Sequence, residues 1–75
     1  MQLAVRRDLL KKIMEEKGWS KKRFAVELEI NYSYFYRILN GERNPGSKFI
    51  SGFLKFCREN DLSFEEYVYI NLAKK

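Results

Sequence analysis

WSKKRFAVELEINYSYFYRILNGERNP, residues 19–45, is the stretch of this sequence that says most about its fold. Its apolar residues recur at the three- and four-residue spacing of amphipathic helices. Ser20 and Asn31 are of types preferred at helix N-caps, and each precedes one of two apolar patterns. We therefore expect one helix at about 21–28 and another at about 32–40, joined by about three residues.

The same helical spacing extends to both sides of this stretch. It predicts helices at about 4–17 and about 48–59. A further helix is expected at about 64–73, because Ser63 and Glu66 have the spacing of a capping box. No segment alternates between apolar and polar residues for long enough to predict a strand. The expected fold is therefore all-α, a compact domain of five helices.

Length and composition limit the organisation and the chemistry of the chain. The 75 residues are enough for one domain, so we expect residues 1–75 to form a single unit. The sequence has no histidine, which excludes His-based catalytic triads and His-containing metal sites. Its one cysteine excludes an internal disulfide. We expect no enzyme activity, no cofactor, no metal and no small-molecule ligand.

Charge and hydropathy indicate a class of partner and a compartment. The net charge is +5, and the excess of lysine and arginine lies in residues 17–48. A basic balance of this kind first suggests nucleic acid. The apolar runs are far shorter than the roughly 20 residues of a membrane span, and the N-terminus lacks the apolar stretch of a signal peptide. We expect a soluble, cytoplasmic protein without a membrane partner.

Two short helices joined by about three residues are typical of a helix-turn-helix, whose second helix lies in the major groove of DNA. The stretch resembles the lambda-repressor/Cro-like helix-turn-helix family, also called the xenobiotic-response-element family, with the motif at about 20–40. The matching features are a small residue before the turn, apolar residues around the turn and on the second helix, and a polar exit. They are Ala25, Leu28, Ile30, Phe35, Ile38, Asn40-Gly41 and Arg43-Asn44-Pro45.

This resemblance implies a sequence-specific, double-stranded-DNA-binding transcriptional regulator. It further implies a repressor or Cro-like switch of a phage, mobile element or bacterial operon, acting in a bacterial cytoplasm or nucleoid or in a phage-infected cell. Two positions depart from the family pattern. The family usually has glycine in the turn, where this chain has Glu29, and a left-handed Glu29 would cost on the order of 1 kcal/mol. The family often has glutamine where this chain has Lys21, which could meet a phosphate as a point charge.

The helix expected at 32–40 has two distinct sides when its residues are placed about 100° apart. Apolar residues gather on one side, and the other side presents the candidate base-reading residues Tyr32, Ser33, Tyr36 and Arg37. Arg37 is the first candidate, because a guanidinium pairs bidentately with guanine. Tyr32 and Tyr36 can contact thymine methyl groups with their rings or a phosphate with their hydroxyls. Ser33 can contact either a base or a phosphate. For the tyrosines, a place in the core is the alternative.

Contacts that position the DNA backbone form a separate class. The candidates are polar and basic residues at helix ends and in the loop that follows the motif: Lys21, Lys22, Asn40, Arg43, Ser47 and Lys48. Lys21 and Lys22 combine their charge with the free amides of a helix N-terminus. A solvated helix face is the alternative for these lysines. Phosphate contacts of this kind would make binding sensitive to salt.

The helix expected at 64–73 carries more apolar surface than one core contact needs. Its apolar side chains span roughly 200° of the helix, whereas a single contact needs a stripe somewhat over about 100° wide. The surplus indicates a homodimer, with Tyr67, Tyr69 and Ile70 as candidate contacts. Such a dimer would place two recognition helices about 34 Å apart, one turn of DNA. Alternatively, this helix inserts between its neighbours and leaves no surface free.

A second class of function competes with DNA binding. A protein-interaction module, for example an antitoxin or an anti-repressor partner, could retain the fold with little DNA binding. Glu29 in the turn and the tyrosine-rich helix favour this interpretation, because tyrosine is enriched at protein interfaces. Lys21, Lys22, Arg37 and Arg43 favour DNA instead. RNA binding has less support, because no aromatic sheet platform is expected.

Overall fold

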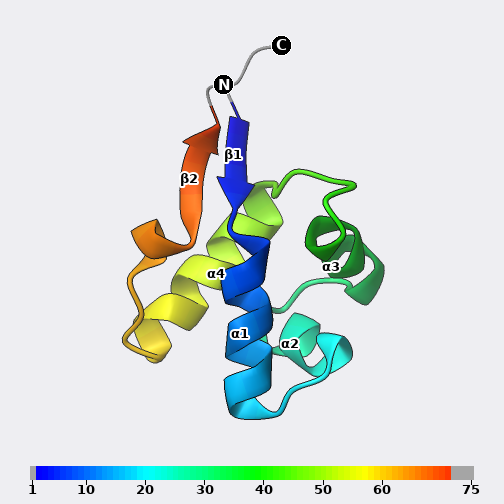
Figure 1. Ribbon diagram of the computed structural model, residues 1–75, viewed down its shortest axis with the longest axis vertical. Coiled ribbons are helices and arrows are strands. Elements are labelled where there is room, and N and C mark those ends of the chain that lie inside the picture. Colours follow the sequence, from blue (N-terminus) through cyan, green and yellow to red (C-terminus); the bar gives the residue numbers. More distant parts are fainter. Residues whose placement is uncertain (1, 72–75) are drawn as a thin grey trace.

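The computed structural model describes residues 2–71 and is built mainly of helices (Figure 1). Its elements are β1 (Gln2–Val5), α1 (Arg7–Lys17), α2 (Lys21–Glu27), α3 (Tyr32–Leu39), α4 (Ser47–Glu59), the 3-10 turn η1 (Phe64–Glu66) and β2 (Val68–Asn71). The two strands form a ribbon that projects beyond the helices at one end, away from α2. Within the described part of the chain, no helix has the length and apolar character needed to cross a membrane.

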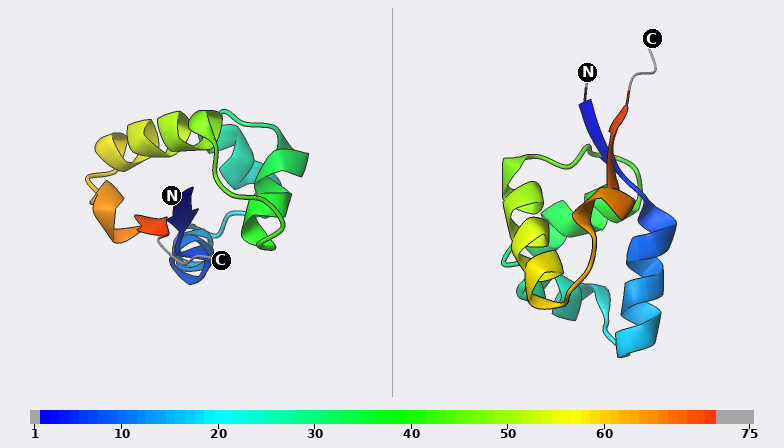
Figure 2. Two further views of the ribbon diagram at one scale, coloured as in Figure 1. Left: turned by 90° about the horizontal axis from the view of Figure 1, so that it is seen from above. Right: turned by 90° about the vertical axis from the view of Figure 1, so that its left-hand side faces the viewer.

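Phenylalanine side chains join three of the helices in a closed circuit of ring contacts. Between ring centroids, Phe24 of α2 lies 5.2 Å from Phe35 of α3 and 5.4 Å from Phe56 of α4. Phe53 stacks on Phe49 at 5.4 Å and on Phe56 at 6.1 Å, and Phe49 reaches Phe35 at 6.4 Å. All five rings are at most 3% exposed. Seen from above, α1, α3 and α4 surround a common centre (Figure 2), and α1 adds its own buried residues Leu10, Ile13 and Met14.

The two helices expected in the middle of the chain are present, and the predicted caps hold them. Ser20 Oγ accepts a hydrogen bond of 3.1 Å from the amide three residues further on. Asn31 Oδ1 accepts one of 2.8 Å from the amide two residues further on. Gly41 follows α3 with a φ of 78°, the left-handed conformation that the sequence predicts there. Each helix ends one residue earlier than expected, at the C-caps Leu28 and Asn40.

The prediction of a fifth helix at 64–73 is wrong, whereas the expected all-α class is confirmed for the body of the domain, to which the described chain adds a two-stranded ribbon. After η1 the chain enters β2, which pairs antiparallel with β1. In its described residues the fold therefore has four α-helices and a two-stranded sheet. β1 also replaces the start of the helix expected at about 4–17, so that α1 begins at Arg7. Residues 72 and 73 of the predicted helix lie outside the described residues.

Pairing between the two ends of the described chain explains this difference. The predicted capping box does not form, because Ser63 Oγ donates to the Glu65 carboxylate at 3.2 Å and caps no backbone amide. The helical segment is limited to the single turn of η1. β2 is rich in β-branched and aromatic residues, which suit a strand once a partner strand is present. Val68 lies opposite Val5 of β1, and both side chains are buried against the helices.

Candidate nucleic-acid interface

A tight turn joins α2 to α3. Glu29 lies in it with a φ of 62°, the left-handed conformation, at the position where the family resemblance leads one to expect glycine. Its carboxylate accepts a hydrogen bond of 3.0 Å from Lys55 Nζ on α4, and both side chains remain largely in solvent. The Ile30 amide donates to the carbonyl of the buried Ala25 at 3.0 Å. The turn thus closes back on α2 and fixes where α3 begins.

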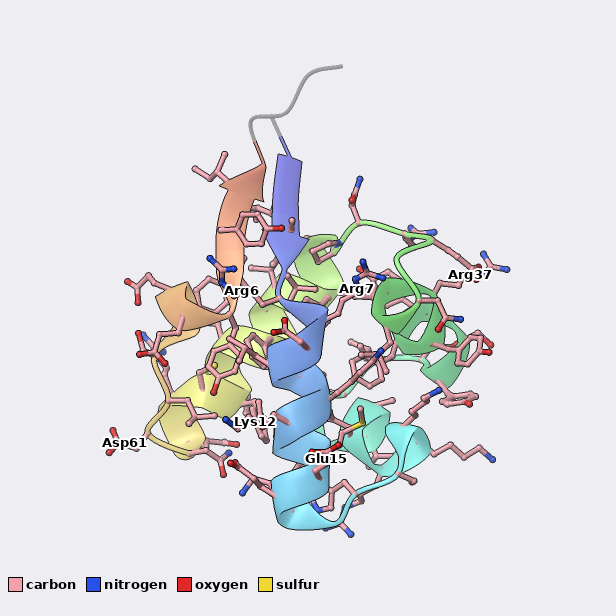
Figure 3. All side chains as sticks on the ribbon, viewed as in Figure 1. Arg6, Arg7, Lys12, Glu15, Arg37 and Asp61 are labelled. Atoms are coloured by element: carbon pink, nitrogen blue, oxygen red, sulfur yellow. The ribbon has the colours of Figure 1, made fainter. Side chains whose placement is uncertain are left out.

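The outward side of α3 carries all four predicted base-reading residues. The inward side anchors the helix through three side chains that are at most 1% exposed, namely Phe35, Ile38 and Leu39. Opposite them, one surface hollow is lined by Tyr32, Ser33, Tyr36, Arg37 and Glu42. Figure 3 shows Arg37 reaching outward from α3, on the side away from α1. The structure therefore brings the predicted base-reading residues together on one accessible face.

Two lysines of α2 extend this face. Lys21 Nζ lies 5.0 Å above the ring centroid of Tyr36, and Lys22 Nζ lies 5.9 Å above that of Tyr32. The two tyrosine rings are themselves 6.0 Å apart. An ammonium over an aromatic face is attracted to the ring quadrupole. The first turn of α2 therefore places its positive charges directly beside the residues on α3.

A second basic group lies at the start of α4. Arg43, Ser47 and Lys48 line a hollow with the polar turn residues before α3. The Arg43 guanidinium stacks over the Tyr34 ring at 5.0 Å, and the Tyr34 hydroxyl accepts a hydrogen bond of 2.8 Å from the Gly46 amide. This hydrogen bond ties α3 to the N-cap of α4. Tyr34 is therefore a structural residue of the site, half-buried and on the margin of α3.

Asn40 is placed differently from the other candidates for phosphate contact. It is the C-cap of α3, and its Nδ2 donates to the Glu42 carboxylate at 3.4 Å. It lines neither of the two hollows that gather the other residues. Asn40 is exposed at the edge of the face, and its side chain already has a partner there.

The three candidate dimer contacts divide between the inside and the outside of the ribbon. Tyr67 precedes β2, packs edge-on against Phe53 with a centroid distance of 5.4 Å, and is half-buried. Burial raises the pKa of Tyr67. Tyr69 and Ile70 are 42% and 52% exposed, and the Arg6 guanidinium lies over the Tyr69 ring at 4.9 Å. The exposed pair therefore lies on β2, at the opposite end of the molecule from α2.

Three contacts around the motif were not foreseen from the sequence. These are the hydrogen bond of Tyr34 with Gly46, the pair of Glu29 with Lys55, and the approach of Arg7 to Gly41. A Cβ added at Gly41 would overlap the Arg7 guanidinium, so glycine there serves both the left-handed turn and this close approach. Each contact joins residues from different elements, and a local sequence pattern carries no signal for such pairs.

The single cysteine of the chain lies in the core. Cys57 is 1% exposed on the inner side of α4, and burial raises the pKa of its thiol to about 11. The thiol is therefore protonated at neutral pH, whereas a reactive cysteine needs its thiolate. Among residues 2–71, no three His, Cys, Asp or Glu side chains are grouped so as to hold a metal ion.

The comparisons with known proteins agree with this geometry. A helix-turn-helix family model matches residues 10–60, which include α2, the turn and α3. The chain belongs to the lambda-repressor/Cro-like helix-turn-helix family of DNA-binding transcriptional regulators. A similar protein is the uncharacterized HTH-type transcriptional regulator YvzC of Bacillus subtilis (strain 168), which is 30% identical over 73 residues. The match covers 97% of this chain and 91% of YvzC. No solved structure gives a significant match.

Proposed function

We propose that this protein binds a specific double-stranded DNA sequence by placing α3 in the major groove. It acts as a repressor or Cro-like switch of a phage, mobile element or bacterial operon, in the cytoplasm or nucleoid. One observation carries the proposal: α2, α3 and the start of α4 present polar, aromatic and basic side chains on adjoining surfaces. Regulation comes through protein concentration and assembly.

Specific contacts come from the outward side of α3. Arg37 pairs with guanine, because its guanidinium matches the two acceptors that guanine presents in the major groove. Tyr32, Ser33 and Tyr36 contact the base edges or sugar-phosphates on either side of it. Their common hollow supports this role, because one helix face then meets neighbouring base pairs.

Positioning contacts come from two basic groups on either side of the motif. Lys21 and Lys22 hold one stretch of phosphates, at the N-terminus of α2. Arg43, Ser47 and Lys48 hold another, at the start of α4. Asn40 adds a contact once its hydrogen bond to the Glu42 carboxylate opens. These contacts carry no sequence information, and they make the affinity fall as salt rises.

Two copies bind together, and the ribbon supports this part of the proposal. With two strands, each strand of the described sheet has one unpaired edge, which is a template for pairing with another chain. Tyr69 and Ile70 add exposed apolar surface, one side chain on each face of the ribbon. An antiparallel pair of identical strands has two-fold symmetry, which is the symmetry of a palindromic operator. Residues 1–75 act as one unit in each copy, with Tyr67 supporting the ribbon from inside.

Selection from a randomised duplex pool, followed by titration of the selected site, tests the function. Arg37→Glu should lower the affinity by on the order of 10-fold or more, because a base contact becomes a repulsion. Lys12→Glu is the matched control, since it makes the same change of charge on α1, away from α3 (Figure 3). Circular dichroism checks that both variants fold.

The outcomes separate the proposal from its main alternative. A palindromic selected site, lost with Arg37→Glu and kept with Lys12→Glu, supports a dimeric regulator. If Arg37→Glu binds as well as the unchanged protein, α3 is not the reading helix. If no duplex binds even at low salt, the protein is instead an interaction module, for example an antitoxin or anti-repressor partner. Sedimentation at tens of micromolar tests the dimer, and a purely monomeric protein argues against a stable one.

A further inference from the structure

Two tyrosine rings stand one helical turn apart on the outward side of α3. Tyr32 and Tyr36 are 39% and 41% exposed, although the core of this small protein takes up nearly every other ring on α3 and α4. Their centroids are 6.0 Å apart, with 43° between the ring planes. The two rings therefore form one continuous aromatic surface on the helix that we place in the major groove.

The lysines of α2 hold this aromatic surface in position. Lys21 and Lys22 each lie over one ring, so an ammonium covers part of each tyrosine from the α2 side. The rest of each ring borders the hollow that contains Ser33 and Arg37. Contact with a cation from a neighbouring helix restricts the ring, and restricted side chains lose less entropy when they bind.

The chemistry of the major groove limits what such a surface can recognise. The base edges there present hydrogen-bond donors and acceptors, and the one apolar group among them is the 5-methyl group of thymine. Two ring faces beside an arginine match a thymine methyl group better than they match a polar base edge. The separation of 6.0 Å between the rings corresponds to between one and two base-pair steps of roughly 3.4 Å each.

We propose that Tyr32 and Tyr36 are specificity-determining residues that recognise the 5-methyl groups of two thymines one or two steps apart. These thymines neighbour the guanine that Arg37 contacts. The inference rests on the proposed function and deepens it, because it names the group that the rings select. It also assigns the rings, and not the phenolic hydroxyls, as the recognising part of these side chains.

Replacing thymine by deoxyuridine in the selected site tests this directly. The change removes one methyl group and leaves base pairing and every hydrogen-bonding group in place. At one or two positions in each half-site we expect the affinity to fall about fourfold, which corresponds to one buried methyl group. At the other thymines, deoxyuridine should bind like thymine.

Protein variants then show which residue contacts each methyl group. At the thymine that Tyr36 contacts, Tyr36→Ala should bind the thymine and deoxyuridine sites with equal affinity, because the ring that contacts the methyl group is gone. Tyr36→Phe should keep the fourfold difference, since it retains the ring and loses only the hydroxyl. Tyr32→Ala and Tyr32→Phe make the same comparison at the second position. Arg37→Ala is the matched control on the same helix, and it should weaken binding while keeping the difference at both positions.

The results distinguish failure of this inference from failure of DNA binding. Specific binding with no deoxyuridine effect at any position overturns the methyl contact and leaves the proposed function standing. An effect that Tyr32→Ala and Tyr36→Ala both leave unchanged assigns the methyl contact to other residues and also overturns the inference. If the Phe variants lose the deoxyuridine effect as fully as the Ala variants do, the hydroxyls and not the rings make the contact, which overturns the inference. No binding to any duplex at low salt overturns both proposals.

Discussion

Glu29 shows how one residue can depart from the pattern of its family without changing the fold. Its φ of 62° is a conformation that glycine adopts freely and that costs other residues on the order of 1 kcal/mol. The hydrogen bond to Lys55 Nζ joins this turn to α4. The position was predictable from the family resemblance, whereas the partner on α4 was not, because it lies far away in the sequence.

Glu29→Gly should stabilise the protein. The strain of the left-handed conformation is removed, and the flexibility that glycine gives to the unfolded chain offsets part of the gain, so we expect about 0.5 kcal/mol more stability. Urea unfolding followed by circular dichroism measures the change. Lys55→Ala is the control for the lost ion pair, which lies in solvent and contributes little. A destabilised Glu29→Gly with a neutral Lys55→Ala would mean that the turn is not strained.

At Gly52, α4 passes close to the backbone at the end of α2. A Cβ at this position would overlap the carbonyl oxygen of Leu28, the C-cap of α2. Gly52→Ala should therefore destabilise the protein by about 1–3 kcal/mol, the usual cost of overpacking, even though alanine favours helices. Ser51→Ala, on the exposed side of the same turn of α4, is the matched control and should be close to neutral. A Gly52→Ala variant as stable as Ser51→Ala would contradict the close approach.

At the scale of elements, α2 and α3 were predictable because their signals are local. Ser20 and Asn31 cap the helices, Gly41 terminates α3, and the apolar spacing selects the buried sides, all within a few residues of each helix. The outward positions of Arg37 and its neighbours followed from the same spacing. The expected placement of these side chains on one face of α3 is confirmed, and their role in reading DNA stays a prediction.

The ribbon was not predictable in this way. Each strand has four residues, too few for alternation to be recognised, and each becomes a strand by pairing with the other end of the described chain. The segment after Ser63 even carried a helix-start pattern. Ser63 instead donates a hydrogen bond to the nearby Glu65 carboxylate. As a strand, β2 pairs with β1 and buries Val68, and a continued helix would not form this strand pairing.

Two substitutions in β2 measure what the ribbon contributes. Val68 faces the core opposite Val5 and is 7% exposed, so Val68→Ala should cost about 1–2 kcal/mol of stability. Ile70 lies two residues further along the same face, opposite Leu3, and is 52% exposed. Ile70→Ala should change the stability of the monomer by less than about 0.5 kcal/mol. Urea unfolding at low protein concentration compares the two. Equal losses would contradict the difference in burial between the part of β2 that packs on the helices and the part that projects beyond them.

At the scale of the whole molecule, the positive charge is concentrated where the motif lies. The net charge is +5, and basic residues of α2, α3 and the start of α4 surround the proposed reading face. The ribbon lies at the far end from α2. Only the α2 part of this basic surface lies far from the ribbon, because Ser47 at the start of α4 lines one hollow together with Leu3 of β1.

The salt dependence of DNA binding should report individual lysines. Lys21→Ala and Lys22→Ala should each reduce the slope of log affinity against log salt by about 1, because each releases one fewer counterion. Lys12→Ala on α1 is the control and should leave the slope nearly unchanged. Titrations of a duplex at four or five salt concentrations measure the slopes. Equal slopes in all three variants would show that α2 does not meet phosphates.

The pairing of Gln2 with Asn71 has a mechanical consequence. Because the strands are antiparallel, these two residues lie at the same end of the ribbon, and a pull between them loads the hydrogen bonds one after another. The ribbon then opens at low force, one strand hydrogen bond at a time. The phenylalanine circuit that joins α2, α3 and α4 is loaded only afterwards. A stretched molecule therefore loses its ribbon first and keeps the helix-turn-helix in place.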